Sequence, residues 1–252
     1  MVSKGINQPG DNGMLTKNHD QLTIEVKKHI ESDMVTQGTY WDGSRGCFIG
    51  CLAHSSDVSV LGDRFGLPEP LVRICEIIFE TLTPDDAKAF FAVIPDAVGC
   101  DGKDLTRVHW AFMASELQAL PNVSDEIQAV IDPVIEGMLL LCSGQEWPNA
   151  AKHADAAALA AYTSRVSTAH TPEPAAHAAY TLGGFAAHAA YTAAACVSFD
   201  AASDADRAAH AAADTSAAAR IAHCVALATS SATRIRQRDT ILRLIEQSQV
   251  TT

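Results

Sequence analysis

The chain has 252 residues, 48% of them hydrophobic, and a formal net charge of −12 at pH 7. This length suits one large domain or two small ones, and the acidity argues against nucleic acids and anionic membranes as partners because both are negatively charged. The seven cysteines are odd in number and irregularly spaced, which argues against a disulfide framework and favours a reduced, cytoplasmic protein.

Residues 1–20 are polar and contain several glycines. They lack the apolar core of a secretory signal peptide, so we expect a flexible N-terminal lead-in. Long apolar runs are also lacking elsewhere, because His, Asp and Arg interrupt the alanine-rich stretches. The sequence therefore predicts a protein without a membrane partner.

Between residues 21 and 148, apolar side chains recur at helical spacing. Two such patterns consist of Leu22, Val26, Ile30 and Met34, and of Leu71, Ile74, Ile78 and Leu82. The segment FGLPEP between them predicts a helix stop. TPDD at 83–86 predicts the next helix start, with Thr83 as N-cap and Pro84 in the first turn.

Further helices are predicted up to residue 148. Asp104 is a candidate N-cap for a helix through Val108, Phe112 and Leu117, and either Ser124 or Asp132 starts the segment that ends in MLLLC. No run alternates cleanly over the length of a strand, and only a weak hairpin signal lies at 39–49. These patterns predict a predominantly α-helical, all-α fold with a helical domain at 21–148.

Residues 149–252 form a second region, in which alanine provides 35 of the 83 residues from 150 to 232. AAHAAYT occurs at 175–181 and again at 186–192, an 11-residue repeat that keeps one helical phase. TPEP at 171–174 and Gly183-Gly184 should interrupt the helix. We expect an alanine-rich helical hairpin or bundle packed against the first domain, with oligomerisation through these helices as an alternative.

Histidines and arginines of this second region have plain structural explanations. His177, His188 and His210 share one phase, but eleven helical residues span about 16 Å, so they cannot hold one ion within a single helix. The last helix is expected to run from about 204 to 248, with the arginines of RIRQRD (234–239) favourable to its dipole near the C-terminal end. A docking patch for an acidic partner is the alternative.

The densest chemistry lies in GTYWDGSRGCFIGCLAHSSD, residues 38–57. On a helix from Cys47 to Asp57, Cys47, Cys51 and His54 would share one face, where two thiolates and an imidazole are suitable ligands for zinc. Cys75 or His109 would supply a fourth ligand. Alternatively, the cysteines are small hydrophobic side chains of the core.

The same residues suggest nucleophilic catalysis. Cys47 would lie at a helix N-terminus next to Arg45, both of which lower a thiol pKa. Either His54 or His109 would serve as base, with Asp57 orienting it. This arrangement resembles papain-like cysteine peptidases, which place a cysteine at a helix start after a glycine-rich turn. Their catalytic histidine comes from a β-sheet, however, whereas TRVHWAF around His109 predicts a helix.

A ligand pocket is a third interpretation. Tyr40, Trp41, Asp42 and Arg45 bring stacking, acceptor and donor groups into six residues, as ligand pockets require. The alternative is that Tyr40 and Trp41 are core anchors beside a turn formed by DGSRG.

The motifs GTYW, GC-x-x-GC-x-x-HS and I-F-E-x-L between residues 37 and 82 resemble a group of proteins from tailed phages and bacteria with an alanine-rich C-terminal half. The group has no assigned reaction. The resemblance implies an intracellular, phage-encoded accessory protein. The resemblance singles out certain positions as parts of the motif but gives them no roles. These positions are Tyr40, Trp41, Cys47, Cys51, His54 and Glu80.

One position departs from the group, whose members often carry a second histidine near Asp57. Two functions therefore remain open. The first is a small-ligand, thiol or metal site around residues 38–57, with Glu80 added to the ligand-binding candidates. The second is a non-enzymatic helical module, an adaptor or inhibitor, that binds a protein partner through the alanine-rich helices.

Overall fold

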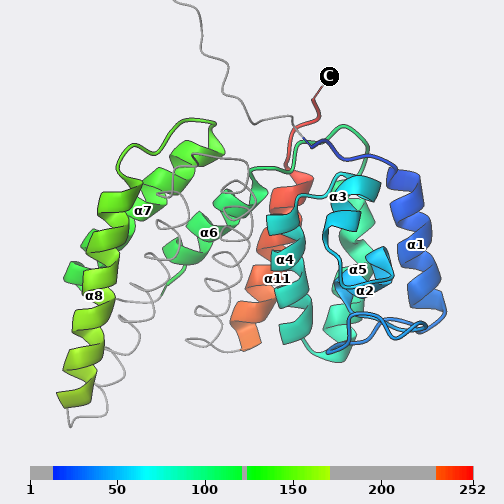
Figure 1. The fold of residues 1–252 in the computed structure, drawn as a ribbon, viewed down its shortest axis with the longest axis horizontal. Helices are drawn as coiled ribbons and strands as arrows, with labels where there is room; N and C mark the ends of the chain where they lie inside the picture. Colours follow the sequence, from blue (N-terminus) through cyan, green and yellow to red (C-terminus); the bar gives the residue numbers. More distant parts are fainter. Residues whose placement is uncertain (1–13, 121–123, 171–230, 252) are drawn as a thin grey trace, which may run out of the picture.

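The computed structural model describes residues 14–120, 124–170 and 231–251 (Figure 1). Within these ranges the regular structure is helical, and extended pairing is limited to isolated bridges such as Trp41 with Gly46. The predicted all-α fold is confirmed. The predicted hairpin at 39–49 is reduced to that single bridge.

The helices are short in the first half and longer afterwards. They are α1 (His19–Glu31), α2 (Phe48–Ala53), α3 (Ser59–Phe65), α4 (Glu69–Thr81), α5 (Pro84–Val98), α6 (Val108–Gln118), α7 (Asp125–Cys142), α8 (Ala150–His170) and α11 (Ser231–Glu246). Helices α1 to α5 form one group, and α6 to α8 form a second (Figure 1). Helix α11 lies between the two groups and packs against α4, α5 and α6.

Predicted caps account for several helix starts. Thr83 accepts a hydrogen bond from the backbone N–H of Asp86 at 3.3 Å, and Ser124 caps α7 through the N–H of Ile127 at 3.5 Å. The prediction for Asp104 was wrong. Its carboxylate accepts the N–H of Thr106 at 2.9 Å and forms a local turn, so α6 begins only at Val108.

Four phenylalanines form the centre of the first group of helices. Phe48 of α2 lies 6.4 Å from Phe79 of α4, and 6.0 and 5.7 Å from Phe90 and Phe91 of α5, measured between ring centroids. All four side chains are fully buried. Because aromatic burial contributes a large apolar area, this cluster anchors the short helix α2 to the two longer ones.

The segment before α1 is packed from Met14 onward. Thr16 is buried; its hydroxyl donates to the carbonyl of Cys100 at 2.9 Å, and its N–H donates to the carbonyl of Lys103 at 2.9 Å. Lys103 is buried too, and its ammonium group donates to the carbonyls of Ile245 and Glu246 at the end of α11. Thr16 therefore joins the segment before α1 to the loop between α5 and α6, and Lys103 joins that loop to the end of α11. Residues 1–13 lie outside the described part.

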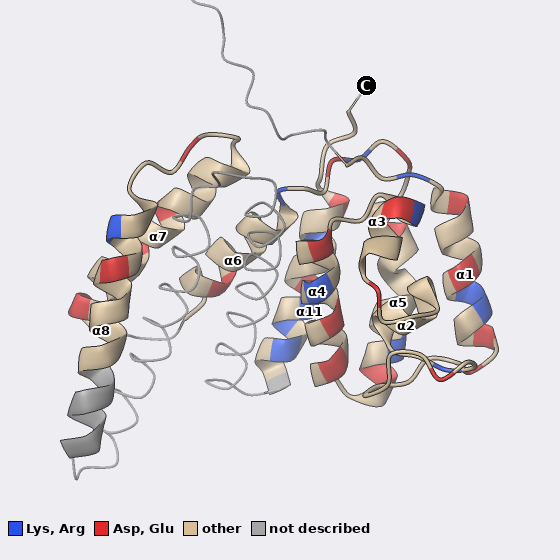
Figure 2. Ribbon diagram, in the orientation of Figure 1, with Lys and Arg blue, Asp and Glu red and all other residues tan. Residues whose placement is uncertain are grey.

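The arginines of α11 make tertiary contacts. This corrects the expectation that they serve the helix dipole near the C-terminal end. Arg236 forms a bidentate ion pair with Glu116 of α6, at 2.6 and 2.8 Å. Arg234 donates to the carbonyl of Thr81 at 2.6 Å, and Arg238 lies 3.5 Å from Asp86. Figure 2 shows these basic residues along the start of α11, where they join it to its neighbours.

Only part of the alanine-rich region is described. In α8, Ala150, Ala154, Ala157 and Ala161 are buried, and the helix packs against α7. The repeats with His177, His188 and His210 lie outside the described residues. In the described part, no helix combines the length and apolarity needed to cross a membrane.

Candidate functional site

The loop from Asp33 to Cys47 is held by backbone hydrogen bonds, such as that from the N–H of Cys47 to the carbonyl of Thr39 at 2.8 Å, and by side chains. The amide nitrogen of Gln37 donates to the carbonyls of Phe79 and Leu82, at 2.7 and 3.1 Å. Glu80 accepts the N–H of Gly38 at 2.9 Å. Asp42 accepts the N–H groups of Ser44 and Arg45, at 2.8 and 2.7 Å, which confirms the turn in DGSRG.

Helix α2 is shorter than expected. The predicted helix from Cys47 to Asp57 was wrong at its end, because it stops at Ala53 and His54 takes a left-handed conformation with φ of 53°. Cys47 is the extended residue before the helix. The shared face of Cys47, Cys51 and His54 therefore does not exist: both cysteines are buried, whereas the side chain of His54 is 38% exposed.

The loop crosses directly over α2 at Gly50. A Cβ atom on Gly50 would lie 1.2 Å from the carbonyl oxygen of Tyr40, and one on Gly46 would lie 2.3 Å from the same atom. Only glycine permits this approach of two backbones. The crossing fixes where Trp41, the next residue, is placed relative to the end of α2.

Replacing Gly50 with Ala should lower the free energy of unfolding by about 1–3 kcal/mol, because the added methyl group must push the Tyr40 backbone away. Chemical denaturation would measure the change. Gly62→Ala is the matched control, because a Cβ at that helical position would meet the flexible side chain of Met14 at 3.2 Å and the Leu67 carbonyl at an ordinary contact distance of 3.6 Å. Equal stability of the two variants would contradict the proposed packing.

His29 of α1 and His54 meet at the end of α2. Their Nε2 atoms are 3.2 Å apart, and Glu25, one turn before His29, contributes a carboxylate. One ligand atom from each of these three residues lies within 4.8 Å of the others. We name this group the His-Glu site.

The ring of His29 has a defined orientation. Its side chain is 1% exposed, and Nδ1 donates to the backbone carbonyl of Glu25 at 2.7 Å. Because a carbonyl only accepts, the proton of a neutral ring lies on Nδ1, and Nε2 presents its lone pair to His54. Histidines that bind metals commonly use one nitrogen in this way while the other holds the ion.

The two carboxylate oxygens of Glu25 differ in their contacts. Oε1 accepts from the guanidinium of Arg64 at 3.1 Å. Oε2 is buried, has no hydrogen-bond partner among the residues that the structure describes, and lies 4.0 Å from Nε2 of His54. A buried acceptor without a partner is uncommon in native proteins and calls for an explanation.

Trp41 covers the site. Its ring stacks on that of His54, with centroids 4.7 Å apart and planes 26° apart, and it meets His29 edge-on at 5.9 Å. Burial lowers the pKa of His54, while the charge of Glu25 acts in the opposite direction and His29 adds to the lowering. His54 is therefore neutral at neutral pH and has a lone pair available.

Cys47 lies in a different group, with Glu76 and Glu80 of α4. Glu76 accepts the N–H of Ile49 at 3.0 Å, and the thiol of Cys47 donates to the carbonyl of Tyr40 at 3.9 Å. Burial, followed by the charge of Glu76, holds the pKa of Cys47 far above its ordinary range. This thiol stays protonated, which is the reverse of what a nucleophile needs.

The contacts of Cys51 are those of a core residue. It is fully buried and its thiol donates to the carbonyl of Gly46 at 3.2 Å. Burial raises its pKa to about 12. Cys75, the suggested fourth ligand, is also buried, and burial raises its pKa. These environments favour the structural interpretation of the cysteines.

The other predicted residues are dispersed. Asp57 accepts the N–H and hydroxyl of Ser59, at 3.0 and 2.7 Å, in a local turn just before α3. Tyr40 is 44% exposed, Asp42 forms its turn, and Arg45 lines a separate pocket. His109 is buried in the first turn of α6.

Sequence reasoning missed Glu25 and His29. Their spacing, E-x-x-x-H, was visible in the first predicted helix and places both side chains on one face. Nothing in the sequence indicated that His54 would meet this face. Recognition required the turn at His54 and the packing of α2 on α1.

No family model, no curated protein and no solved structure matches this chain. The fold and the site thus define it only as an all-α protein with a candidate His-Glu site. The resemblance to phage and bacterial proteins with the GTYW motif stays a prediction.

Proposed function

We propose that the protein binds a divalent transition metal ion, with zinc as the best fit, through His29, His54 and Glu25. The observation that carries this proposal is the approach of the two Nε2 atoms to 3.2 Å beside a buried carboxylate oxygen without a partner. Two ligands of a tetrahedral zinc ion, each about 2.0–2.1 Å from the metal, lie roughly 3.3 Å apart.

The surroundings favour such an ion. Nδ1 of His29 is already bound by a backbone carbonyl, and Arg64 holds the second oxygen of Glu25. These contacts orient two of the three ligands before metal binds. The ion would lie between the two Nε2 atoms in place of their direct contact, and Oε2 of Glu25 would gain a partner.

Three protein ligands leave one position of a tetrahedral ion open, as in catalytic zinc sites. His54, the most exposed of the three, lies toward solvent, and Trp41 stacks on its ring. Water or a small ligand would occupy the open position. Among the alternatives of a metal, thiol or ligand site, the metal site therefore has the best geometric support, with two ligands that differ from those first expected.

The experiment is a zinc titration of the metal-free protein, followed by calorimetry, with Co²⁺ absorption to report the ligand geometry. We expect one equivalent to bind and His54→Ala to weaken binding more than about 100-fold, because even the partners of ligands typically contribute 10–100-fold. Glu25→Gln should weaken binding while keeping a contact to Arg64.

Two control variants separate the possible ligand sets. His19→Gln removes a histidine at the start of the same helix, and Cys47→Ala removes a ligand of the set first expected. Both should bind zinc like the unchanged protein. No saturable binding, or equal affinity after His54→Ala in a folded variant, would refute the His-Glu site.

The helical interaction module stays an alternative prediction. Its main feature, the 11-residue repeat, lies at residues that the structure does not describe. The described part of α8 shows only that buried alanines pack on α7.

A further inference from the structure

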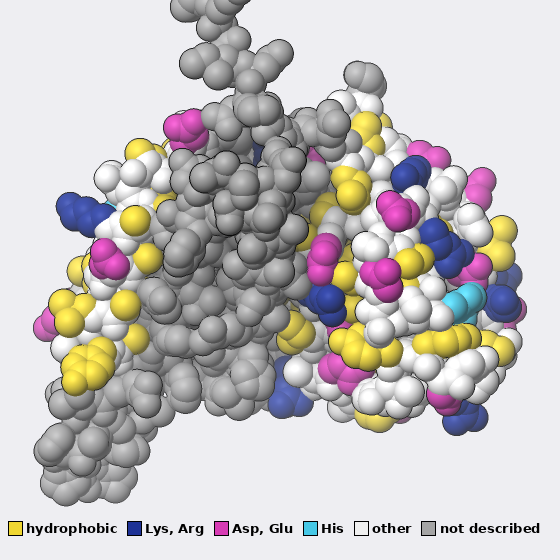
Figure 3. Space-filling model, in the orientation of Figure 1, with side chains coloured by type: hydrophobic (Ala, Val, Ile, Leu, Met, Phe, Trp, Pro, Cys, Tyr) yellow, Lys and Arg dark blue, Asp and Glu magenta, His cyan; other side chains and the backbone are white. Residues whose placement is uncertain are grey.

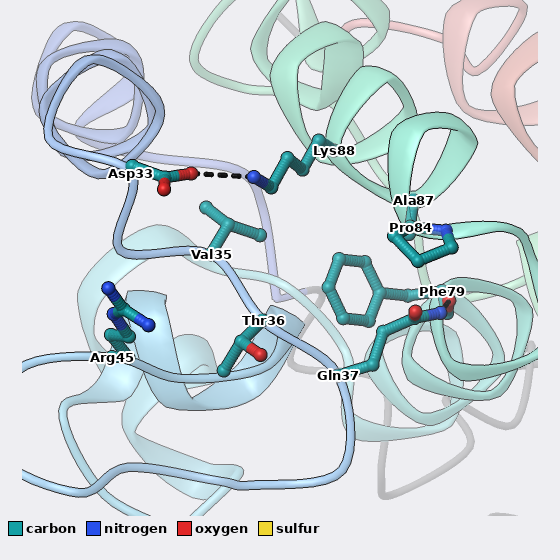
Figure 4. Close-up of a pocket in the computed structure, with 9 residues that line it drawn as sticks. All are labelled: Asp33, Val35, Thr36, Gln37, Arg45, Phe79, Pro84, Ala87 and Lys88. Atoms are coloured by element: carbon teal, nitrogen blue, oxygen red, sulfur yellow. Dashed lines mark hydrogen bonds and ion pairs between the residues drawn. The ribbon is translucent and has the colours of Figure 1, made fainter.

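A second pocket lies on the other part of the same loop. It is a cavity of about 370 Å³ between the loop after α1 and the start of α5 (Figure 4). Its lining residues are Asp33, Val35, Thr36, Gln37, Arg45, Phe79, Pro84, Ala87 and Lys88. None of these belongs to the His-Glu site, so the two features are independent.

One end of the pocket is charged. Figure 4 shows Arg45 and Lys88 on the side of Asp33, and the ammonium group of Lys88 is 2.6 Å from the Asp33 carboxylate. Among the lining residues, two cations face one anion, although the chain carries a net charge of −12. Asp42, which lies outside the lining, also interacts electrostatically with Arg45. On the face seen in Figure 3, acidic and basic side chains are interspersed.

Arg45 is the group that needs a partner. Its side chain forms no ion pair or hydrogen bond with any of the described residues, whereas its backbone N–H is held by Asp42 at 2.7 Å. The acidic residue that lines the pocket is Asp33. The hydrogen bond with Lys88 is the largest cause of its lowered pKa, and the charge of Arg45 is the smallest. The guanidinium fork is therefore positioned by its backbone and open to a carboxylate or phosphate.

The other end is apolar. Val35, Phe79 and Ala87 are buried and form the floor, and the exposed ring of Pro84 forms the rim. Gln37 lies beside this floor, with both of its amide hydrogen bonds already given to the carbonyls of Phe79 and Leu82. Only its side-chain oxygen is left to accept a bond from a ligand.

We propose that this pocket binds a small organic acid, with its carboxylate or phosphate group at Arg45 and Lys88 and its apolar body over Val35 and Ala87. The volume is in the range of small-molecule sites, about 300–1,000 Å³. The ligand class follows from the polarity of the pocket: an excess of cations at one end and a hydrophobic floor at the other.

The test is binding of phenyl phosphate, benzoate and inorganic phosphate to the EDTA-treated protein, followed by calorimetry at low salt. We expect one of the two aromatic acids to bind saturably and at least about tenfold more tightly than inorganic phosphate, because the floor adds apolar contact. Comparison of the two aromatic acids identifies the anionic group.

Charge variants give opposite expected shifts. Arg45→Gln should weaken binding about tenfold or more, and Asp33→Asn should strengthen it because a competing carboxylate is removed. Arg73→Gln is the matched control, since Arg73 pairs with Glu69 elsewhere on α4. His54→Ala should leave this affinity unchanged, so failure here and failure of the metal site are separable.

Three results would overturn the proposal. The first is no saturable binding of either aromatic acid. The second is equal affinity of the Arg45→Gln variant and the unchanged protein. The third is that neither aromatic acid binds more tightly than inorganic phosphate, which would show that the apolar floor makes no contribution.

Discussion

Replacement of Arg236 with Ala should lower the free energy of unfolding by about 3–5 kcal/mol, the typical cost of breaking a buried ion pair. Glu116 is 0% exposed and receives both guanidinium nitrogens of Arg236 together with the amide of Gln237. Without Arg236, the amide of Gln237 would be the one partner left to this buried carboxylate among the described residues.

Urea denaturation, followed by circular dichroism, would measure this loss. A second change, Glu116→Gln in the Arg236→Ala background, should recover part of it because the buried charge is removed. Arg243→Ala is the control: that side chain is exposed and, within the described ranges, its hydrogen bond goes to Gln247 of its own helix, at 3.0 Å, so its loss should stay within about 0.5 kcal/mol. Similar values for Arg236→Ala and Arg243→Ala would show that the pair contributes little.

The ion pair between Arg236 and Glu116 also helps to position α11 in the fold. The helix lies between the two groups of helices, and Arg236 reaches α6 while Arg234 and Arg238 reach the end of α4 and the start of α5. A buried ion pair is a weak source of net stability but a strong constraint on register. We therefore expect loss of Arg236 to loosen the contact between the two groups of helices.

His109 gives the second large effect, a loss of stability in acid. The ring is buried on α6 against Trp110, 4.1 Å away between centroids, and neither nitrogen forms a hydrogen bond of good geometry with the described part of the chain. Burial lowers its pKa to about 4, and a weak backbone contact at Thr106 acts in the opposite direction. Folding therefore requires the neutral ring.

The sign follows from the two protonation states. The unfolded chain has a histidine pKa of about 6.5 and binds a proton first as the pH falls. The stabilising contribution of the neutral ring is complete above pH 6.5 and is lost as the pH falls toward 4. The pKa difference corresponds to roughly 3 kcal/mol.

Denaturation curves between pH 7 and 4, measured for the unchanged protein and for His109→Leu, would isolate this contribution. The variant should lose less stability over that interval, and at pH 7 it should be at least as stable, because an apolar side chain of similar size replaces a ring without polar partners. Parallel pH profiles would contradict the burial of a neutral imidazole.

Local signals predicted the helices well where they act within a few residues. The apolar spacing of Leu71, Ile74 and Ile78 predicted α4, and Thr83 with Pro84 predicted the start of α5, because periodicity and capping depend on the neighbouring residues alone. Asp104 shows the limit of such signals. An aspartate can begin a helix or close a turn, and at Asp104 it closes a turn before α6.

The candidate site was located only in part. The stretch 38–57 contributes Trp41 and His54 to the His-Glu site and Arg45 to the second pocket, but Cys47 and Cys51 point into the core. The error arose from one backbone conformation. His54 adopts φ of 53°, which ends α2 and turns the imidazole away from the cysteines.

The sequence by itself determined the helical class, the starts of α5 and α7 and the segment that carries the chemistry. The tertiary structure alone decided which side chains meet. His29 and His54 are 25 positions apart. They approach because Gly50 lets the loop cross α2 and because Phe48 anchors α2 against α4 and α5. Such contacts depend on the packing of distant segments, which no local pattern encodes.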